Sequence, residues 1–246
     1  MGLEGFTMNE QLFTGRVDYY EKARPEVASE AVDYLCSLVS KDAVFADIGA
    51  GTGKFTSLIA ERGYSVYAVE PNHEMHSVLS DKLKDYSNVD IICASAEFTR
   101  IPASSVDVVV VVTALHWFDL RKFSAECLRI LKPDGFVVVI YNSRKEELRS
   151  SIGHSKDNAT YKFFDGHYNI VEFPNTHLYS REEFIAYKLS HATAPKIGDD
   201  NFDSYMREIL SDFDSASVDG RYCFEFISVL YIDDNFIHNK TKMVEE

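Results

Sequence analysis

The sequence predicts an α/β fold built on a doubly wound, mostly parallel sheet with helices on both faces. Three observations indicate it. Residues 106–113 form a β-branched run without polar alternation, which is typical of a strand buried on both faces. Strand-like runs alternate with segments of helical spacing, and a glycine-rich turn joins the first strand to a helix. The 246 residues suit one large domain, so we expect a single domain over 1–246.

The other elements follow in chain order. Apolar residues at helical spacing predict helices at 26–38, 73–83, 120–131, 182–189 and 202–213. Apolar and β-branched runs predict strands at 44–47, 65–69, 89–94, 106–113, 136–141, 170–179 and 221–231. Lys132-Pro133-Asp134-Gly135 predicts a turn, because proline presets one dihedral and glycine frees another. The polar end, 235–246, is expected to fray.

The glycine-rich turn lies within Val44–Thr56. Its apolar run stops at Asp47, and glycines follow at Gly49, Gly51 and Gly53. Glycine tolerates unusual dihedrals and the close approach of a ligand, while the following helix offers unpaired amide groups and a positive dipole end. The stretch predicts a site for a nucleotide-like ligand, with an ordinary glycine-rich connection as the alternative.

An acidic residue follows the second strand. Glu70 lies about 20 residues beyond the first motif, where βαβ nucleotide sites place an acid on the ribose hydroxyls. The spacing Gly-x-Gly-x-Gly differs from the Gly-x-Gly-x-x-Gly of dinucleotide sites. It favours a nucleoside ligand without a pyrophosphate, S-adenosylmethionine being the candidate, over a nicotinamide cofactor.

Four stretches occur in a fixed order: Asp47–Gly53, Val69–Pro71, Ala114–Asp119 and Leu128–Gly135. Together they resemble the class I S-adenosylmethionine-dependent methyltransferases, and among them the small-molecule enzymes similar to trans-aconitate methyltransferase. The resemblance runs from about residue 19 to residue 144. It implies a Rossmann-like, seven-stranded sheet whose closing strand is antiparallel.

The resemblance also implies which residues bind S-adenosylmethionine and its product S-adenosylhomocysteine. They are Asp47, Gly49, Ala50, Gly51, Gly53, Glu70, Pro71, Met75, Ser95, Ala96, Glu97, Thr113 and Arg24. Ser95 stands where the family usually has an aspartate that binds the adenine amino group, so we expect a weaker base contact. Arg24 belongs to a Tyr-x-x-x-Arg-Pro pattern in an N-terminal arm, residues 1–25, that the family folds over the site; its planar fork suits a carboxylate.

The methyl acceptor is expected beyond the run 106–113, because ligands of open α/β sheets bind at the carboxyl ends of the strands. His116 is the expected catalytic residue, as base for a hydroxyl or amine acceptor or as anchor for a carboxylate. The expected substrate-binding residues are Tyr20, His116, Trp117, Asn142 and Arg144, with an insert at 145–168 as a cap. A structural histidine and a core tryptophan are the alternatives.

Composition excludes several classes. A net charge of −14 disfavours a nucleic-acid partner. No stretch approaches the roughly 20 apolar residues of a membrane span and no leader is visible, so we expect a cytoplasmic protein without a membrane partner. We expect no metal site, because His73 and His76 lack a third ligand. Four cysteines, Cys36, Cys93, Cys127 and Cys223, are expected to be reduced and buried.

We therefore expect an S-adenosylmethionine-dependent methyltransferase that acts on a small molecule, with a carboxylate as one acceptor class. A nicotinamide-dependent oxidoreductase and a non-catalytic adenosyl-binding or partner-docking protein remain as alternatives. The sequence leaves the oligomeric state open.

Overall fold

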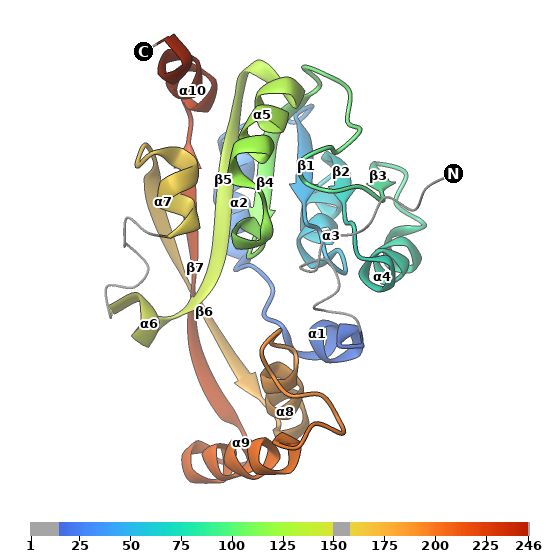
Figure 1. Ribbon diagram of the computed structural model, residues 1–246, viewed down its shortest axis with the longest axis vertical. Helices are drawn as coiled ribbons and strands as arrows, with labels where there is room; N and C mark the ends of the chain where they lie inside the picture. The colour runs from blue at the N-terminus through green and yellow to red at the C-terminus, as the bar shows by residue number, and fades with distance from the viewer. Residues whose placement is uncertain (1–14, 150–157, 246) are drawn as a thin grey trace. The chain divides into compact units, whose positions relative to one another are not determined.

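The computed structural model describes residues 15–149 and 158–245 (Figure 1). The chain divides into two compact units, Glu26–Asn175 with Ile227–Glu246 and Met1–Pro25 with Thr176–Phe226. Compactness does not decide whether a unit folds by itself, so the single domain stays a prediction.

The sheet has seven strands in the order β3-β2-β1-β4-β5-β7-β6. Six strands are parallel and the closing strand, β7, is antiparallel, which confirms the predicted fold class. The strands are β1 Val44–Ile48, β2 Ser65–Val69, β3 Val89–Ile92, β4 Val106–Val112, β5 Leu131–Arg144, β6 Asn169–Tyr179 and β7 Tyr222–Asp233. The order reverses between β1 and β4, and the carboxyl edge of the sheet at this switch point is where such folds bind ligands.

Helices cover both faces of this sheet in the larger unit. On one face lie α2 (Ser29–Ser37) and α3 (Lys54–Glu61); on the other lie α5 (Leu120–Ile130), α7 (Ala159–Phe164) and α10 (Phe236–Glu245). Figure 1 shows α5 crossing β4 and β5. Three further elements are α4 (His73–Leu83), the 3₁₀ turn η2 (Leu115–Trp117) and α6 (Lys145–Arg149).

The second unit contains α1 (Val17–Ala23), α8 (Arg181–Leu189) and α9 (Phe202–Ala216). Its core is aromatic and includes Tyr179, Phe184, Phe213 and Phe224. Arg16, the residue before α1, is buried and donates to the carbonyls of Leu189 and Ala194. An arginine at the carboxyl end of α8 matches the negative end of the helix dipole, so it stabilises the attachment of α1.

The β-branched run explains why β4 lies in the middle of the sheet. Val109 and Val111 pack into the core under α5, whereas Val108 and Val110 pack into the core under α2 and α3. Both faces of β4 are therefore buried away from solvent, as the absence of polar alternation predicted.

Two segments differ from the prediction. The expected turn at 132–135 lies inside β5, where Leu131 pairs with Val106 but Phe136 pairs with Val108. Residues 132–135 therefore form a bulge rather than a chain reversal. The carboxyl-terminal segment was expected to fray, but it forms helix α10. The helix is held in place because Phe236 is fully buried and Lys240 binds Asp165 and the carbonyl of Phe163.

Cysteine exposure corrects a third expectation: Cys127 is buried, but Cys223 is exposed. Within residues 15–149 and 158–245, no helix combines the length and the apolarity that crossing a bilayer requires.

Candidate functional site

The glycine turn requires glycine for conformation and for packing. Gly49, Gly51 and Gly53 have φ of +73°, +59° and +79°, in the left-handed region. A Cβ on Gly49 would lie 2.9 Å from the Cβ of Ala114 and 3.2 Å from the ring of Phe118. The turn after β1 therefore touches the loop after β4, as the predicted position of the acceptor requires.

Glu70 is held beside this turn by two backbone amides. Its Oε2 accepts the N–H of Gly51 at 2.8 Å, and its Oε1 accepts the N–H of Asn72 at 2.8 Å. The Asn72 side chain in turn caps α4 by accepting the N–H of Met75. These two amides orient the Glu70 carboxylate, and a carboxylate is the kind of acceptor that suits the two hydroxyls of a diol.

Asp47 is the last residue but one of β1 and is buried. Its Oδ2 accepts the Thr56 hydroxyl at 2.6 Å, while Oδ1 is buried without a hydrogen-bond partner. Burial raises the pKa of Asp47 to about 6, although the hydrogen bonds from Thr56 act in the opposite direction. The hydroxyl of Thr52 is also buried and unpartnered. Two unsatisfied polar atoms at one turn are uncommon in a folded protein and fit a site that a polar ligand completes.

The loop after β3 carries the predicted adenine contacts. Ser95 is half-buried and Ala96 is buried. Glu97 accepts the backbone N–H of Asp119 at 2.9 Å, so it joins this loop to the start of α5. The contacts of Ser95, Ala96 and Glu97 with adenine stay predictions.

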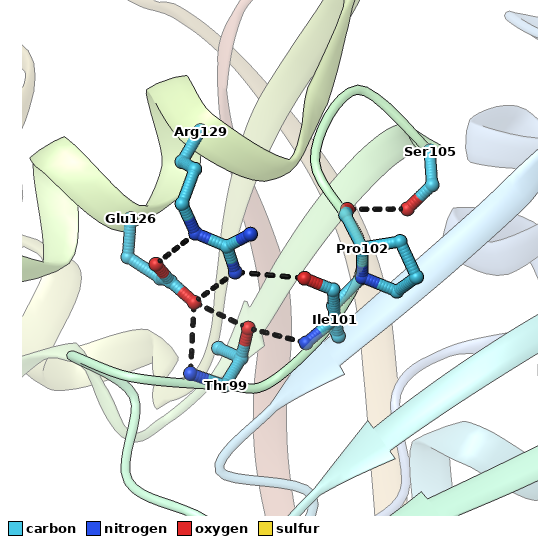
Figure 2. Close-up of polar contacts among 6 residues, drawn as sticks. All are labelled: Thr99, Ile101, Pro102, Ser105, Glu126 and Arg129. Carbon is cyan, nitrogen blue, oxygen red and sulfur yellow. Dashed lines mark hydrogen bonds and ion pairs between the residues drawn. The ribbon is translucent and has the colours of Figure 1, made fainter.

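A buried network anchors the same loop further along (Figure 2). Glu126 of α5 accepts the N–H and the hydroxyl of Thr99 at 2.8 and 2.5 Å, and it accepts Nη2 of Arg129 at 2.7 Å. Arg129 also donates to the carbonyl of Ile101 at 2.8 Å. Burial raises the pKa of Glu126, but the hydrogen bonds from Arg129 and Thr99 outweigh it and hold the pKa below the ordinary value.

Thr113 is strained at the end of β4. Its φ is +53°, a conformation that β-branched residues rarely adopt, and its N–H donates to the carbonyl of Ile140 at 2.8 Å. Such strain collects at functional sites, where the surrounding structure maintains it. The chain then enters η2, which presents His116 at the surface with its ring centroid 4.5 Å from that of Trp117.

The aromatic neighbour of His116 across the strands is Tyr141. The two rings are 6.4 Å apart and inclined by only 27°. The Tyr141 side chain is hydrogen-bonded to Thr160 of α7, and burial raises its pKa. Tyr141 is not among the site residues predicted from the sequence; the signal that points to it is the alternation of side chains along β5, once the face of the sheet beneath η2 is known.

Asn142 faces the other side of the sheet. Its Nδ2 donates to the carbonyl of Glu26 at 3.0 Å, and its Oδ1 accepts the Ser228 hydroxyl at 2.6 Å. Arg144, two residues further along β5, shares the face of Asn142. Of the predicted substrate residues, the structure brings His116 and Trp117 together and separates them from Asn142; a substrate role for Asn142 and Arg144 stays a prediction.

Tyr20 and Arg24 belong to the second unit. Arg24 donates to the carbonyl of Ser190 at 3.4 Å and lies 5.7 Å from the ring centroids of Tyr20 and Tyr187. Their predicted contacts with cofactor or substrate stay predictions. The arm residues 1–14 and the insert residues 150–157 lie outside the described residues.

The insert reaches η2 through its second helix. Helix α7 contacts both η2 and α5, and α6 adjoins the end of β5.

Among the predicted cofactor residues, Met75 is buried at the start of α4 and Pro71 is half-buried beside Glu70. In the described ranges, no three histidine, cysteine or acidic side chains are grouped so that they could hold a metal ion.

Comparison with known proteins agrees with this arrangement. Residues 46–139 match the family model described as a methyltransferase domain. The uncharacterized methyltransferase Rv3342 of Mycobacterium tuberculosis is 37% identical over 136 residues, which cover 55% of this chain and 54% of the relative. The uncharacterized methyltransferase-like protein C25B8.10 of Schizosaccharomyces pombe is 35% identical over 130 residues, 52% of this chain and 50% of the relative. The chain thus spans about half the length of these relatives.

Solved structures show the fold. A candidate type II methyltransferase of Anaeromyxobacter dehalogenans superposes with a TM-score of 0.62 at 19% identity, covering 85% of this chain and 96% of that one. The cyclase SpnF superposes with a TM-score of 0.55 at 13% identity, covering 92% and 96%. Residues 46–139 therefore match a methyltransferase domain, and the solved structures share the Rossmann-like fold of this chain.

Proposed function

We propose that this protein transfers a methyl group from S-adenosylmethionine to a small-molecule acceptor. One observation carries the proposal: Glu70 is fixed by the amides of Gly51 and Asn72 beside a left-handed glycine turn, at the carboxyl edge of β1 and β2. This is the arrangement that a nucleoside ligand without a pyrophosphate needs.

The residues present fit this cofactor. Glu70 carries the two acceptor oxygens that suit the vicinal hydroxyls of a ribose. The unpartnered Oδ1 of Asp47 suits a donor such as an ammonium group, and the unpartnered hydroxyl of Thr52 suits a polar group of the same ligand. When bound, S-adenosylmethionine supplies a methyl group activated by its sulfonium.

The acceptor side is assigned to η2 and the ends of β4 and β5. For a hydroxyl or amine acceptor, the imidazole of His116 takes the acceptor proton; for a carboxylate, it holds the oxygen. The chain's main contribution is to hold the acceptor in line with the methyl group, which can lower the barrier by several kcal/mol. A small carboxylic acid of the kind that trans-aconitate methyltransferase accepts is the first acceptor class to screen.

Calorimetric titration with S-adenosylmethionine and S-adenosylhomocysteine tests the cofactor. Wild-type protein should bind both, and Glu70→Gln, which keeps the size of the side chain, should bind about 10-fold more weakly or worse, the cost of losing a hydrogen bond to a charged partner. Glu30→Ala, an exposed acid on α2, is the matched control and should bind like wild type.

Failure to bind either ligand would remove the basis of the proposal. A positive titration would justify a screen of labelled methyl transfer to small acids, alcohols and amines, with His116→Ala as the reference variant. Turnover that survives His116→Ala would exclude the histidine from both proposed roles.

A further inference from the structure

We propose that Tyr141 is a positioning residue for the His116 imidazole, and that helix α7 sets the position of Tyr141 through Thr160. The importance of this arrangement for catalysis rests on the function proposed above. The arrangement itself can be tested without any turnover.

The first argument is the exposure of His116. It lies in a three-residue 3₁₀ turn at the surface, directly after the strained Thr113. A catalytic group must be held in one orientation when it acts, so the rings beside this exposed imidazole bear directly on its geometry.

Two rings flank this imidazole. Trp117, its sequence neighbour, has its ring at 4.5 Å and 49°, and Tyr141 has its ring at 6.4 Å and 27°. Tyr141 comes from β5 rather than from the loop, so it links the imidazole to the sheet. A nearly parallel ring contact restricts both the position and the tilt of the imidazole.

Tyr141 is itself held at both its hydroxyl and its ring. Its side chain is hydrogen-bonded to Thr160, which is 3% exposed. Its ring meets the buried Tyr231 edge-on at 6.3 Å and 80°. Because both its hydroxyl and its ring are held, Tyr141 is a rigid support for the imidazole ring of His116.

Thr160 connects this support to the insert. It is the second residue of α7, a helix capped by Asn158, whose side chain accepts the N–H of Tyr161 at 2.7 Å. Because α7 lies between β5 and β6 in the chain, a change in the insert can reorient His116 without touching the acceptor.

Proton–carbon correlation spectra of protein with labelled histidine test this proposal. The chain has eight histidines, and the His116 signal is the one missing in His116→Ala. Tyr141→Leu removes the ring, and with it a ring-current shift that arises from proximity alone, so the readout is the line width of the His116 signal, which should increase when the imidazole is no longer held. Tyr141→Phe keeps the ring but loses the bond to Thr160, so it should restore most of the wild-type position and broaden the signal.

Three controls distinguish positioning from a general loss of structure. The signals of His73 and His76 on α4 should not move in any variant. Tyr231→Phe keeps a ring in place and should leave His116 unchanged. Thr160→Val should broaden the His116 signal as Tyr141→Phe does, and Thr160→Ser, which restores a hydroxyl, should reverse this.

The outcomes are separable. A His116 signal in Tyr141→Leu that is as narrow as in wild type overturns the proposal, and so do shifts that spread to His73 and His76 in both Tyr141 variants. A Thr160→Val spectrum identical to wild type overturns the part assigned to α7. Titration of the same variants with S-adenosylhomocysteine should match wild type; absence of binding by wild type would instead count against the proposed function.

Discussion

Thr56 donates its hydroxyl to one oxygen of Asp47 at 2.6 Å, while the second oxygen of that carboxylate is buried without a partner. The pair lies where β1 meets the glycine turn and α3. One hydrogen-bonded oxygen does not offset the burial of a charge, so the carboxylate is unfavourable when ionised. We expect Asp47 to lower stability at neutral pH.

Asp47→Asn tests this expectation. The folded pKa of Asp47 is about 6 against an ordinary value of 3.8, so stability that is fully present below about pH 4 is lost as the pH rises through 6. Above pH 6 the variant should therefore be more stable by up to about 3 kcal/mol, and the difference should vanish near pH 4. Urea denaturation across this range measures it, with the exposed Asp90→Asn as control. Equal stability at pH 7.5 would refute the assignment.

In the other unit, the contribution of His191 to stability is expected to depend on pH in the opposite direction to that of Asp47. Burial, reinforced by the charge of Arg24, lowers its pKa to about 4, although its Nδ1 contacts the carbonyl of Tyr187 at 2.9 Å. Its contribution to stability is present above the unfolded pKa of about 6.5 and is lost as the pH falls toward 4.

His191→Asn keeps a donor near Nδ1 and cannot ionise. Between pH 7 and pH 5, its denaturation midpoint should fall less than that of wild type. His238→Asn, at an exposed histidine, should follow wild type. If His191→Asn loses as much stability in acid as wild type does, the histidine is not the group responsible.

Thr113→Gly should relieve the strain at the end of β4. Strain of this kind costs about 1–3 kcal/mol, and glycine gives back up to about 1 kcal/mol through its unfolded-state entropy. We expect a net gain in unfolding free energy of about 1 kcal/mol. Thr113→Val keeps both the shape and the strain and should show no gain. Destabilisation by glycine would mean that contacts of the threonine outweigh the strain.

Arg129→Met should destabilise the protein because it leaves the Glu126 carboxylate buried without its cation. Breaking a buried ion pair costs about 3–5 kcal/mol, and we expect the low end because the Arg129 side chain is 39% exposed. Since Glu126 has a lowered pKa, its contribution is present at neutral pH and lost in acid below its ordinary value.

Thermal denaturation of three variants separates this cost from a loss of packing. Glu126→Gln combined with Arg129→Met should recover part of the loss, because no buried charge remains. Lys122→Met breaks an exposed ion pair with Asp119 and should change stability by less than about 1 kcal/mol. A double variant less stable than Arg129→Met would contradict the electrostatic explanation.

Much of the sheet could be predicted because its signals are local. The valines of β4 report burial on both faces, and the bounds of β2 and α4 are those expected from spacing. The bulge at 132–135 could not be foreseen, because Pro133 and Gly135 are typical of a turn between two elements, and only the pairing of Leu131 and Phe136 with β4 shows that the segment lies inside one strand. Helix α10 likewise depends on distant partners of Phe236 and Lys240.

The candidate site was predicted in part. Motif spacing predicted where the glycine turn, Glu70 and His116 lie, because each of them comes shortly after the end of a predicted strand. It could not show that Tyr141 rather than Asn142 meets His116, because the choice depends on which face of β5 lies under η2. The strain of Thr113 also has no sequence signal, since threonine is an ordinary residue at a strand end.

The opposite orientation of Tyr141 and Asn142 has a practical consequence for redesign. Tyr141, whose ring lies beside His116, and Asn142, whose side-chain amide binds Glu26 and Ser228, are successive residues of β5. They share no side-chain partner among the contacts described above. A library that varies position 141 and keeps Asn142 would change the surface offered to acceptors without loosening the junction at Glu26 and Ser228. Under the proposed function, varying the ring beside His116 and preserving the junction at Asn142 are therefore separate choices at neighbouring codons.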